Sequence, residues 1–133
     1  MTAKYLSPLQ PNLITKRGDR QQWGRLYGSS FGLVISEAAH RHPGILLVVT
    51  ADTPSATRLE YELRFYNRGN DDIPVLSFPD WETLPYDVFS PHQDILSRRI
   101  ETLYRLPDLK AGLVVVPANT LLQRLAPRNS AAW

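Results

Sequence analysis

The segment ILLVVTADTP, residues 45 to 54, determines which fold class this sequence can adopt. It opens with a continuous apolar run rich in β-branched side chains, which is typical of a parallel strand buried on both faces. Signals for a helix start follow at once, because Thr53 is a favourable N-cap residue and Pro54 suits the first helical position. A buried strand that leads directly into a helix is the repeating unit of α/β folds.

The same alternation continues on both sides of this segment. A helical pattern begins at Ser29 and is stopped by Pro43 and Gly44. Downstream, residues 73 to 78 predict a short second strand, and AGLVVVP at 111 to 117 predicts a third strand that is buried. Strands that alternate with helices favour right-handed crossovers, so we expect a three-layer α/β domain with a mostly parallel sheet.

Further helices are predicted between and after these strands. The helix after the first strand ends at NRGNDD, residues 67 to 72. The sequence SPHQ at 90 to 93 predicts a capping box with proline at the first helical position. Apolar residues recur at helical spacing from 96 to 104 before Pro107 closes that helix, and Asn119 is expected to cap a last one.

The bulk composition excludes several classes of function. The chain has 133 residues with 15 basic and 13 acidic side chains, so its formal net charge is only +2. This charge is too small to predict binding to nucleic acid or to a membrane. The absence of cysteine excludes disulfides, a thiol nucleophile and a thiolate metal site. No apolar run can span a bilayer and no signal-peptide core is present, so we expect a cytoplasmic protein without a membrane partner.

The chain is expected to divide into two parts. Residues 1 to 25 contain prolines and a polar, partly basic run, and are interpreted as an N-terminal arm. Residues 26 to 133 are interpreted as the α/β domain. The sequence reaches Trp133 without a helix stop or the character of a tail, so we expect the natural protein to continue beyond it.

The turn that opens the first helix, LYGSSFGLVIS at 26 to 36, is the first place to look for a nucleotide site. A phosphate-binding loop needs glycines, a lysine that meets the phosphate charge, and a Ser or Thr that holds magnesium. Phe31 and Gly32 stand where that lysine and threonine would be. We therefore expect no functional Walker A motif and no bound cofactor. The degenerate loop comprises Gly28, Ser29, Ser30, Phe31 and Gly32.

The stretch DWETLPYDVFSPHQD, residues 80 to 94, concentrates aromatic, acidic and proline residues. His92 lies beside Asp87 and Asp94, and a histidine with two carboxylates could bind a metal or perform acid–base chemistry. Because no nucleophile is evident nearby, a surface or loop-bracing histidine is the favoured interpretation. The alternative function is a nucleotide- or DNA-binding enzyme domain with an unusual site built from these three residues.

Arg98 and Arg99, with Arg105 further along the same predicted helix, form a basic side. Arg98 and Arg99 are candidate contacts to a DNA backbone, since phosphates are bound mainly by Lys and Arg. Glu101 reduces the charge of this patch. A solvated helix face has the same pattern, and it is the favoured interpretation.

Three blocks carry a family resemblance: FPDWETLPYD at 78 to 87, SPHQDILSRRIETLYRLP at 90 to 107, and GLVVVPANTLLQRLAP at 112 to 127. Together they resemble the N-terminal region of bacterial transcription-repair coupling factors, the Mfd family. The resemblance runs from about Leu26 to Pro127, and its most specific part is the region from residue 80 onward.

That region of the family resembles domain 1a of UvrB, the damage-verifying subunit of nucleotide excision repair. The resemblance implies a RecA-like α/β unit whose phosphate loop is degenerate. UvrB also carries a long hairpin that probes between DNA strands. The stretch from Tyr86 to Asp94 is interpreted as a shortened relic of that hairpin.

The resemblance implies a large cytoplasmic protein that releases RNA polymerase stalled at lesions by ATP-driven translocation on double-stranded DNA. That protein recruits excision repair through UvrA, mainly by an adjoining domain. The motor that uses ATP and magnesium is expected beyond Trp133, so this part is expected to be a non-catalytic scaffold that contacts other domains of the same protein. The structural or interdomain candidates are Trp81, Leu84, Pro85, Tyr86, Asp87, Phe89, Pro91, His92 and Asp94.

Overall fold

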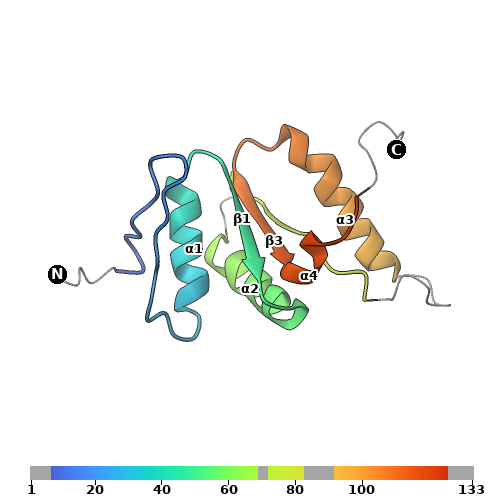
Figure 1. Cartoon of the computed structure of the whole chain (residues 1–133), viewed down its shortest axis with the longest axis horizontal. Helices are drawn as coiled ribbons and strands as arrows, with labels where there is room; N and C mark the ends of the chain where they lie inside the picture. The colour runs from blue at the N-terminus through green and yellow to red at the C-terminus, as the bar shows by residue number, and fades with distance from the viewer. Residues whose placement is uncertain (1–6, 69–71, 83–91, 126–133) are drawn as a thin grey trace.

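The computed structural model describes residues 7–68, 72–82 and 92–125. Helices and strands alternate along this part of the chain (Figure 1). In chain order the elements are α1 (Ser30–Arg41), β1 (Ile45–Thr50), α2 (Thr53–Tyr66), β2 (Val75–Ser77), α3 (Gln93–Arg105), the short 3-10 helix η1 (Leu106–Asp108), β3 (Gly112–Pro117) and α4 (Ala118–Leu121).

The strands form one parallel sheet in the order β1-β3-β2. β3 lies in the centre, where Val115 is aligned with Val48 of β1 and with Ser77 of β2. Every residue of β3 is buried, as its apolar run predicts. The α/β class and the parallel sheet predicted from the sequence are therefore confirmed.

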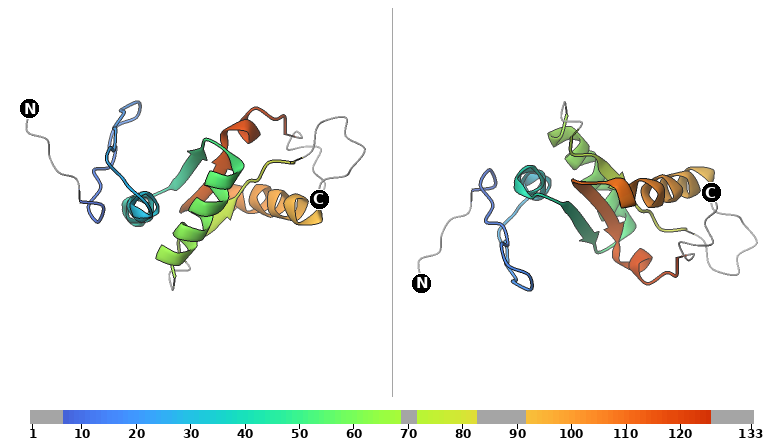
Figure 2. Two further views of the ribbon diagram at one scale, coloured as in Figure 1. Left: turned by 90° about the horizontal axis from the view of Figure 1, so that it is seen from below. Right: turned by 90° about the horizontal axis from the view of Figure 1, so that it is seen from above.

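Helices lie on both faces of the sheet and make it a three-layer domain. On the face covered by α1 and α2, Leu63 and Leu113 are fully buried in the larger core cluster. On the opposite face, a smaller cluster includes Leu76 and Phe78, and α3 packs beside it. Figure 2 shows α1 and α3 on opposite sides of the strands. Burying one large aliphatic side chain contributes on the order of 1.5–3 kcal/mol, so these clusters hold the layers together.

The prediction that the first strand is buried on both faces is wrong for the part of the chain that the structure describes. Leu46 and Val48 pack against the larger core cluster. Leu47 and Val49 point the other way, with exposed fractions of 58% and 47%. The reason is the position of β1 at the edge of the sheet, on the side away from α3, which contacts β2.

The apolar stripe of α3 also differs from a simple core-facing stripe. The buried residues of this helix are Arg99 and Thr102. Leu96, Leu103 and Tyr104 are exposed by 42%, 39% and 77%. Since α3 turns two polar side chains toward the sheet, both of them need hydrogen-bond partners there, and both have them.

Two helix starts differ from the sequence prediction by one or two residues. Asp52, rather than Thr53, caps α2, and its Oδ1 accepts the backbone N–H of Ser55 at 2.8 Å. α3 begins at Gln93 with His92 as its N-cap, whose Nδ1 accepts from the backbone N–H of Asp94 at 3.3 Å. A capping box would place the N-cap at residue 90, which lies outside the described residues. In each helix the observed cap is a side-chain acceptor that binds a backbone N–H of the first turn.

The predicted cap of the last helix is wrong as well. The N-cap of α4 is Pro117, and no side chain caps that helix. The Asn119 amide instead donates from Nδ2 to Oδ2 of Asp80 at 2.7 Å. The Asn119 side chain therefore bonds to a carboxylate through its amide nitrogen, whereas an N-cap would have used its oxygen.

The segment before α1 runs beside that helix (Figure 1). Its carbonyl oxygen at Leu9 accepts from Nη2 of Arg41 at 2.6 Å. Trp23 and Leu26 pack against the larger core cluster, so Trp23 contributes to the core although it lies within the predicted arm. No helix among the described residues combines the length and the apolar character that crossing a membrane requires.

Candidate functional site

A cavity of about 390 Å³ lies where the degenerate phosphate loop, the end of β1 and the start of α2 meet. This is the carboxyl end of a parallel strand, where α/β folds commonly bind ligands. The residues that line the cavity are Gly28, Phe31, Val49, Thr50, Ala51, Ser55, Arg58, Leu59 and Glu62.

The charges around this cavity do not suit a nucleotide phosphate. Among the described residues that line it, the cation is Arg58, which is paired with Glu62 at 3.1 Å between Nε and Oε1. At the N-terminus of α2, hydrogen bonds from Ser55 hold the pKa of the Asp52 carboxyl below its ordinary value. That helix end, which would otherwise attract an anion, therefore already carries one of its own.

Both glycines of the degenerate loop have structural reasons to be glycine. Gly28 has a φ of 57°, in the left-handed region that favours glycine, within the turn closed by the bond from Ser30 N to Tyr27 O. A Cβ at Gly32 would lie only 2.8 Å from Cβ of Glu62. Gly32 therefore permits the close approach of α1 and α2, and needs no phosphate to explain it.

A second constellation holds the start of the DWETLPYD stretch. Arg99 is only 3% exposed, and its Cζ lies 4.1 Å from the ring centroids of both Phe78 and Trp81. Its Nη1 donates to the Pro79 carbonyl at 2.6 Å and to Oε1 of Gln123 at 3.2 Å. A guanidinium held between two aromatic rings forms cation–π contacts that are strongest when desolvated. We call the following set the Arg99 cluster: Arg99, Phe78, Pro79, Asp80, Trp81, Asn119 and Gln123.

Asp80 supplies the negative charge of the Arg99 cluster. Its carboxylate accepts from Asn119 and, through a short contact, from the Gln123 amide. Burial lowers the pKa of the Arg99 guanidinium from its ordinary value, and the Asp80 charge opposes that shift. The cluster thus joins three segments: the residues that follow β2, helix α3, and the turn after α4. They meet beyond the carboxyl ends of β2 and β3.

The cluster places some predicted site residues and leaves others outside the structure's description. Trp81 contacts Arg99 of its own domain, as an architectural interpretation of the stretch requires. Glu82 adopts the left-handed backbone region, with a φ of 59°. Six of the structural or interdomain candidates lie outside the described residues: Leu84, Pro85, Tyr86, Asp87, Phe89 and Pro91.

His92 and Asp94 lie together at the start of α3. Nδ1 of His92 is 3.5 Å from Oδ2 of Asp94, and both side chains are largely exposed. No group of three His, Cys, Asp or Glu side chains suited to a metal occurs within residues 7–68, 72–82 and 92–125. The observed role of His92 is that of a helix cap.

The two arginines predicted to contact DNA separate in the structure. The Arg98 side chain is 57% exposed, with Nη1 3.8 Å from Oε2 of Glu60. Arg99 points inward into its cluster, so a DNA contact does not fit this residue. Asp80 and Gln123 were not predicted to belong to a site, and Asn119 was predicted only as a helix cap. Asp80 and Asn119 follow strand ends, whereas Gln123 follows α4.

Comparison with curated proteins identifies clear relatives, although no protein-family model matches the chain. The transcription-repair-coupling factor of Escherichia coli K12 is 42% identical over 117 residues, or 88% of this chain. That of Haemophilus influenzae is 42% identical over 118 residues, and that of Mycobacterium bovis is 33% identical over 129. The chain spans about 10% of the length of each of these relatives. Because the similarity extends over most of the chain, the chain belongs to the transcription-repair-coupling factor family.

Proposed function

We propose that this chain is a non-catalytic, UvrB-like scaffold domain from the N-terminal region of a longer transcription-repair-coupling factor. In that longer protein, ATP-driven translocation on double-stranded DNA releases RNA polymerase stalled at lesions. Excision repair is recruited through UvrA, which binds mainly to an adjoining domain. The family membership supports the link to transcription and repair, and the chemistry of the described residues supports the scaffold role.

The observation that carries the non-catalytic role is the cavity beside the degenerate phosphate loop. Phe31 occupies the position of the phosphate-binding lysine and is 44% exposed. The cavity's cation, Arg58, is already neutralised by Glu62. Without a free cation the β and γ phosphates of ATP would lose most of their electrostatic stabilisation in this cavity.

Exposed apolar surface supports packing against other parts of the longer protein. Strands of parallel sheets are ordinarily covered on both faces, yet Leu47 and Val49 of β1 are about half exposed. Leu103 and Tyr104 of α3 are exposed as well, on the same helix whose polar residues face the sheet. Apolar surface of this kind marks contact areas in a larger assembly.

Isothermal titration of the 133-residue chain with ATP and magnesium tests the non-catalytic role. We expect no binding with a dissociation constant in the micromolar range, because no described side chain in the cavity offers an unpaired cation. Titration with magnesium alone serves as the control for the cation. Micromolar binding of ATP would overturn the proposal.

Charge substitution on β1 tests the packing role. Leu47→Glu and Val49→Glu should leave the thermal unfolding of the 133-residue chain almost unchanged, because both side chains already contact water. In the longer protein the same substitutions should lower the unfolding temperature, since each would place an unpaired carboxylate in a contact area. An equal change in unfolding temperature in the 133-residue chain and in the longer protein would show that β1 is not covered by another part of the polypeptide.

A further inference from the structure

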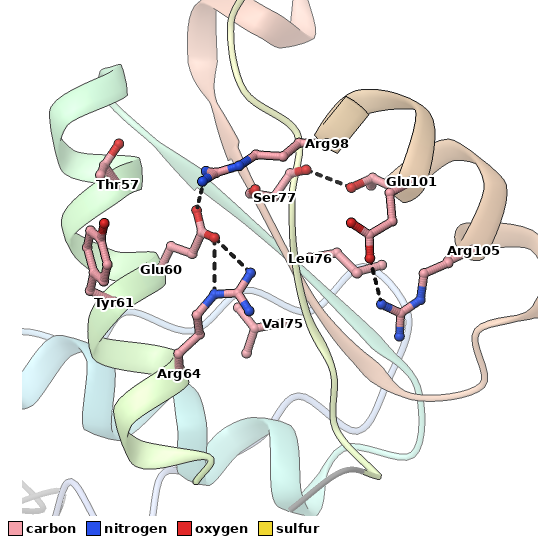
Figure 3. A pocket seen from close by; sticks show the side chains of 11 residues that line it. Thr57, Glu60, Tyr61, Arg64, Val75, Leu76, Ser77, Arg98, Glu101 and Arg105 are labelled. Atoms are coloured by element: carbon pink, nitrogen blue, oxygen red, sulfur yellow. Dashed lines mark hydrogen bonds and ion pairs between the residues drawn. The ribbon is translucent and has the colours of Figure 1, made fainter. Parts of the chain in front are cut away.

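A groove of about 280 Å³ runs along β2 between α2 and α3 (Figure 3). Its floor is the outer edge of β2, which is the terminal strand of the described sheet. The other edge of β2 is used by β3, since the Pro74 carbonyl accepts from Leu113 N at 2.9 Å and Phe78 N donates to the Val115 carbonyl at 2.9 Å.

The alternation of a strand then fixes which main-chain groups face the groove. Groups at residues 74 and 78 point toward β3, so those of Val75 and Ser77 point to the outer edge. The Ser77 carbonyl accepts from Oγ1 of Thr102 at 2.6 Å. The N–H groups of Val75 and Ser77 and the carbonyl of Val75 are thus directed into the groove. A strand edge with such main-chain groups can pair with another strand.

The walls of the groove carry three arginines and two glutamates. Arg64 holds Glu60 at 2.8 Å, and Arg105 holds Glu101 at 3.0 Å. Arg98 reaches from α3 toward Glu60 on α2, as Figure 3 shows, but this ion pair is the longest of the three at 3.8 Å. The described lining residues therefore carry one surplus positive charge, and among them Arg98 is the guanidinium with the longest ion pair.

We propose that this groove binds an extended acidic peptide segment, which adds to the sheet as a further strand beside β2. Its main chain pairs with Val75 and Ser77, as in other recognition by strand addition. Its carboxylates, at alternate positions, project toward α3. One of them takes Arg98 in place of the distant Glu60.

The same observations favour a peptide over nucleic acid. An unpaired strand edge is complementary to a peptide main chain, which offers N–H and carbonyl groups at the matching repeat. A phosphate backbone would gain one surplus cation and would meet Glu60 and Glu101 in the walls. Binding to a phosphate backbone generally uses several lysines and arginines together. Peptide binding in this groove does not depend on whether the separate cavity beside residues 28 to 32 binds a nucleotide.

Fluorescence anisotropy with a fluorescein-labelled peptide of alternating valine and aspartate provides the test, using the 133-residue chain. We expect saturable binding that Arg98→Glu weakens at least about tenfold, the scale of one lost charge-assisted contact. A peptide with lysine in place of aspartate should prefer the Arg98→Glu variant. Arg58→Glu is the matched control. Like Arg98, Arg58 is an exposed helix arginine paired with a glutamate, but it lies on α2 outside the groove.

Further measurements separate strand addition from simple charge attraction. Peptide binding should slow amide hydrogen exchange at Val75 and Ser77, and N-methylation of the peptide main chain should abolish that protection. If Arg98→Glu does not fold by circular dichroism, Arg98→Gln replaces it, with a smaller expected loss. The proposal is overturned if the peptide fails to bind at millimolar concentration, if the N-methylated peptide binds equally well, or if single-stranded oligothymidylate binds as tightly and depends equally on Arg98.

Discussion

The guanidinium of Arg99 stacks on the indole of Trp81, with 4.1 Å between Cζ and the ring centroid. This contact holds the first residues of the DWETLPYD stretch against α3, and the ring centroid of Phe78 lies at the same distance from the guanidinium. Phe78, Asp80 and Trp81 thereby hold the segment after β2 against α3. The described start of the stretch, Asp80 and Trp81, therefore contributes to the architecture beyond the carboxyl end of β2.

Removing Arg99 should destabilise the domain strongly. Arg99→Ala leaves Asp80 without its guanidinium neighbour and exposes two aromatic faces, so we expect a loss of about 2–4 kcal/mol in the free energy of unfolding. Urea unfolding followed by tryptophan fluorescence measures it. Arg98→Ala, on the adjacent exposed residue, should cost below about 1 kcal/mol. Similar losses for the two variants would contradict the structural role of Arg99.

Gly32 should tolerate no larger side chain. In Gly32→Ala the new Cβ would stand 2.8 Å from Cβ of Glu62, which forces α1 and α2 apart. We expect a loss of roughly 1–3 kcal/mol in the free energy of unfolding, as for other overpacked sites. Gly24→Ala is the control, because nothing lies within 4 Å of a Cβ placed there. An unchanged midpoint for Gly32→Ala in urea would show that the two helices are not in close contact.

Asp52 should make part of the stability depend on pH. Its hydrogen bonds from Ser55 lower its pKa in the folded protein, so the unfolded chain takes up the proton first as the pH falls. The stabilisation is complete above the ordinary aspartate pKa of about 3.9 and is lost as the pH falls through the lower folded value. Asp52→Asn keeps a capping side chain but does not titrate.

The measurement for Asp52 is the urea midpoint of both proteins at pH 5 and at pH 3. Other carboxyl groups titrate equally in both, so the difference between the proteins isolates this residue. The native chain should lose more stability over this interval than the Asp52→Asn variant. Parallel losses would show that the helix cap does not stabilise the ionised carboxyl.

Truncation of the core should be far more costly than truncation of the apolar surface. Leu63 is fully buried, whereas Leu122 is 88% exposed. Leu63→Ala should lower the free energy of unfolding by about 2–5 kcal/mol. Leu122→Ala should change it by less than about 0.5 kcal/mol. Thermal unfolding of the 133-residue chain compares the two, and a large loss for Leu122→Ala would place that side chain inside a contact.

Much of the fold could be predicted from local pattern. The β3 run is apolar without interruption, which is typical of a buried strand in a parallel sheet, and β3 lies in the centre of the sheet. The β1 run is equally apolar, yet it lies at an edge where alternate side chains face outward. Periodicity reports how apolar a strand is, and it does not report the strand order that decides how much of it is covered.

The surroundings of the candidate site residues were less predictable, because they too depend on how distant segments pack together. The missing lysine of the phosphate loop is visible in the sequence, because that motif is contiguous. Arg98 and Arg99 look alike in sequence, but one side chain is exposed and the other is buried. One residue along a helix turns a side chain through about 100°, so which arginine meets the sheet depends on how α3 is docked.

The sequence by itself determined the alternation of strands and helices, which depends on residues close together in the chain, and that alternation predicted the parallel sheet. Only the tertiary structure decided that Arg99 lies between Phe78 and Trp81, that Asn119 binds Asp80, and that Arg98 meets Glu60 across β2. These contacts join residues brought together by strand pairing and helix docking. Their energies depend on distances and burial that no local sequence pattern encodes.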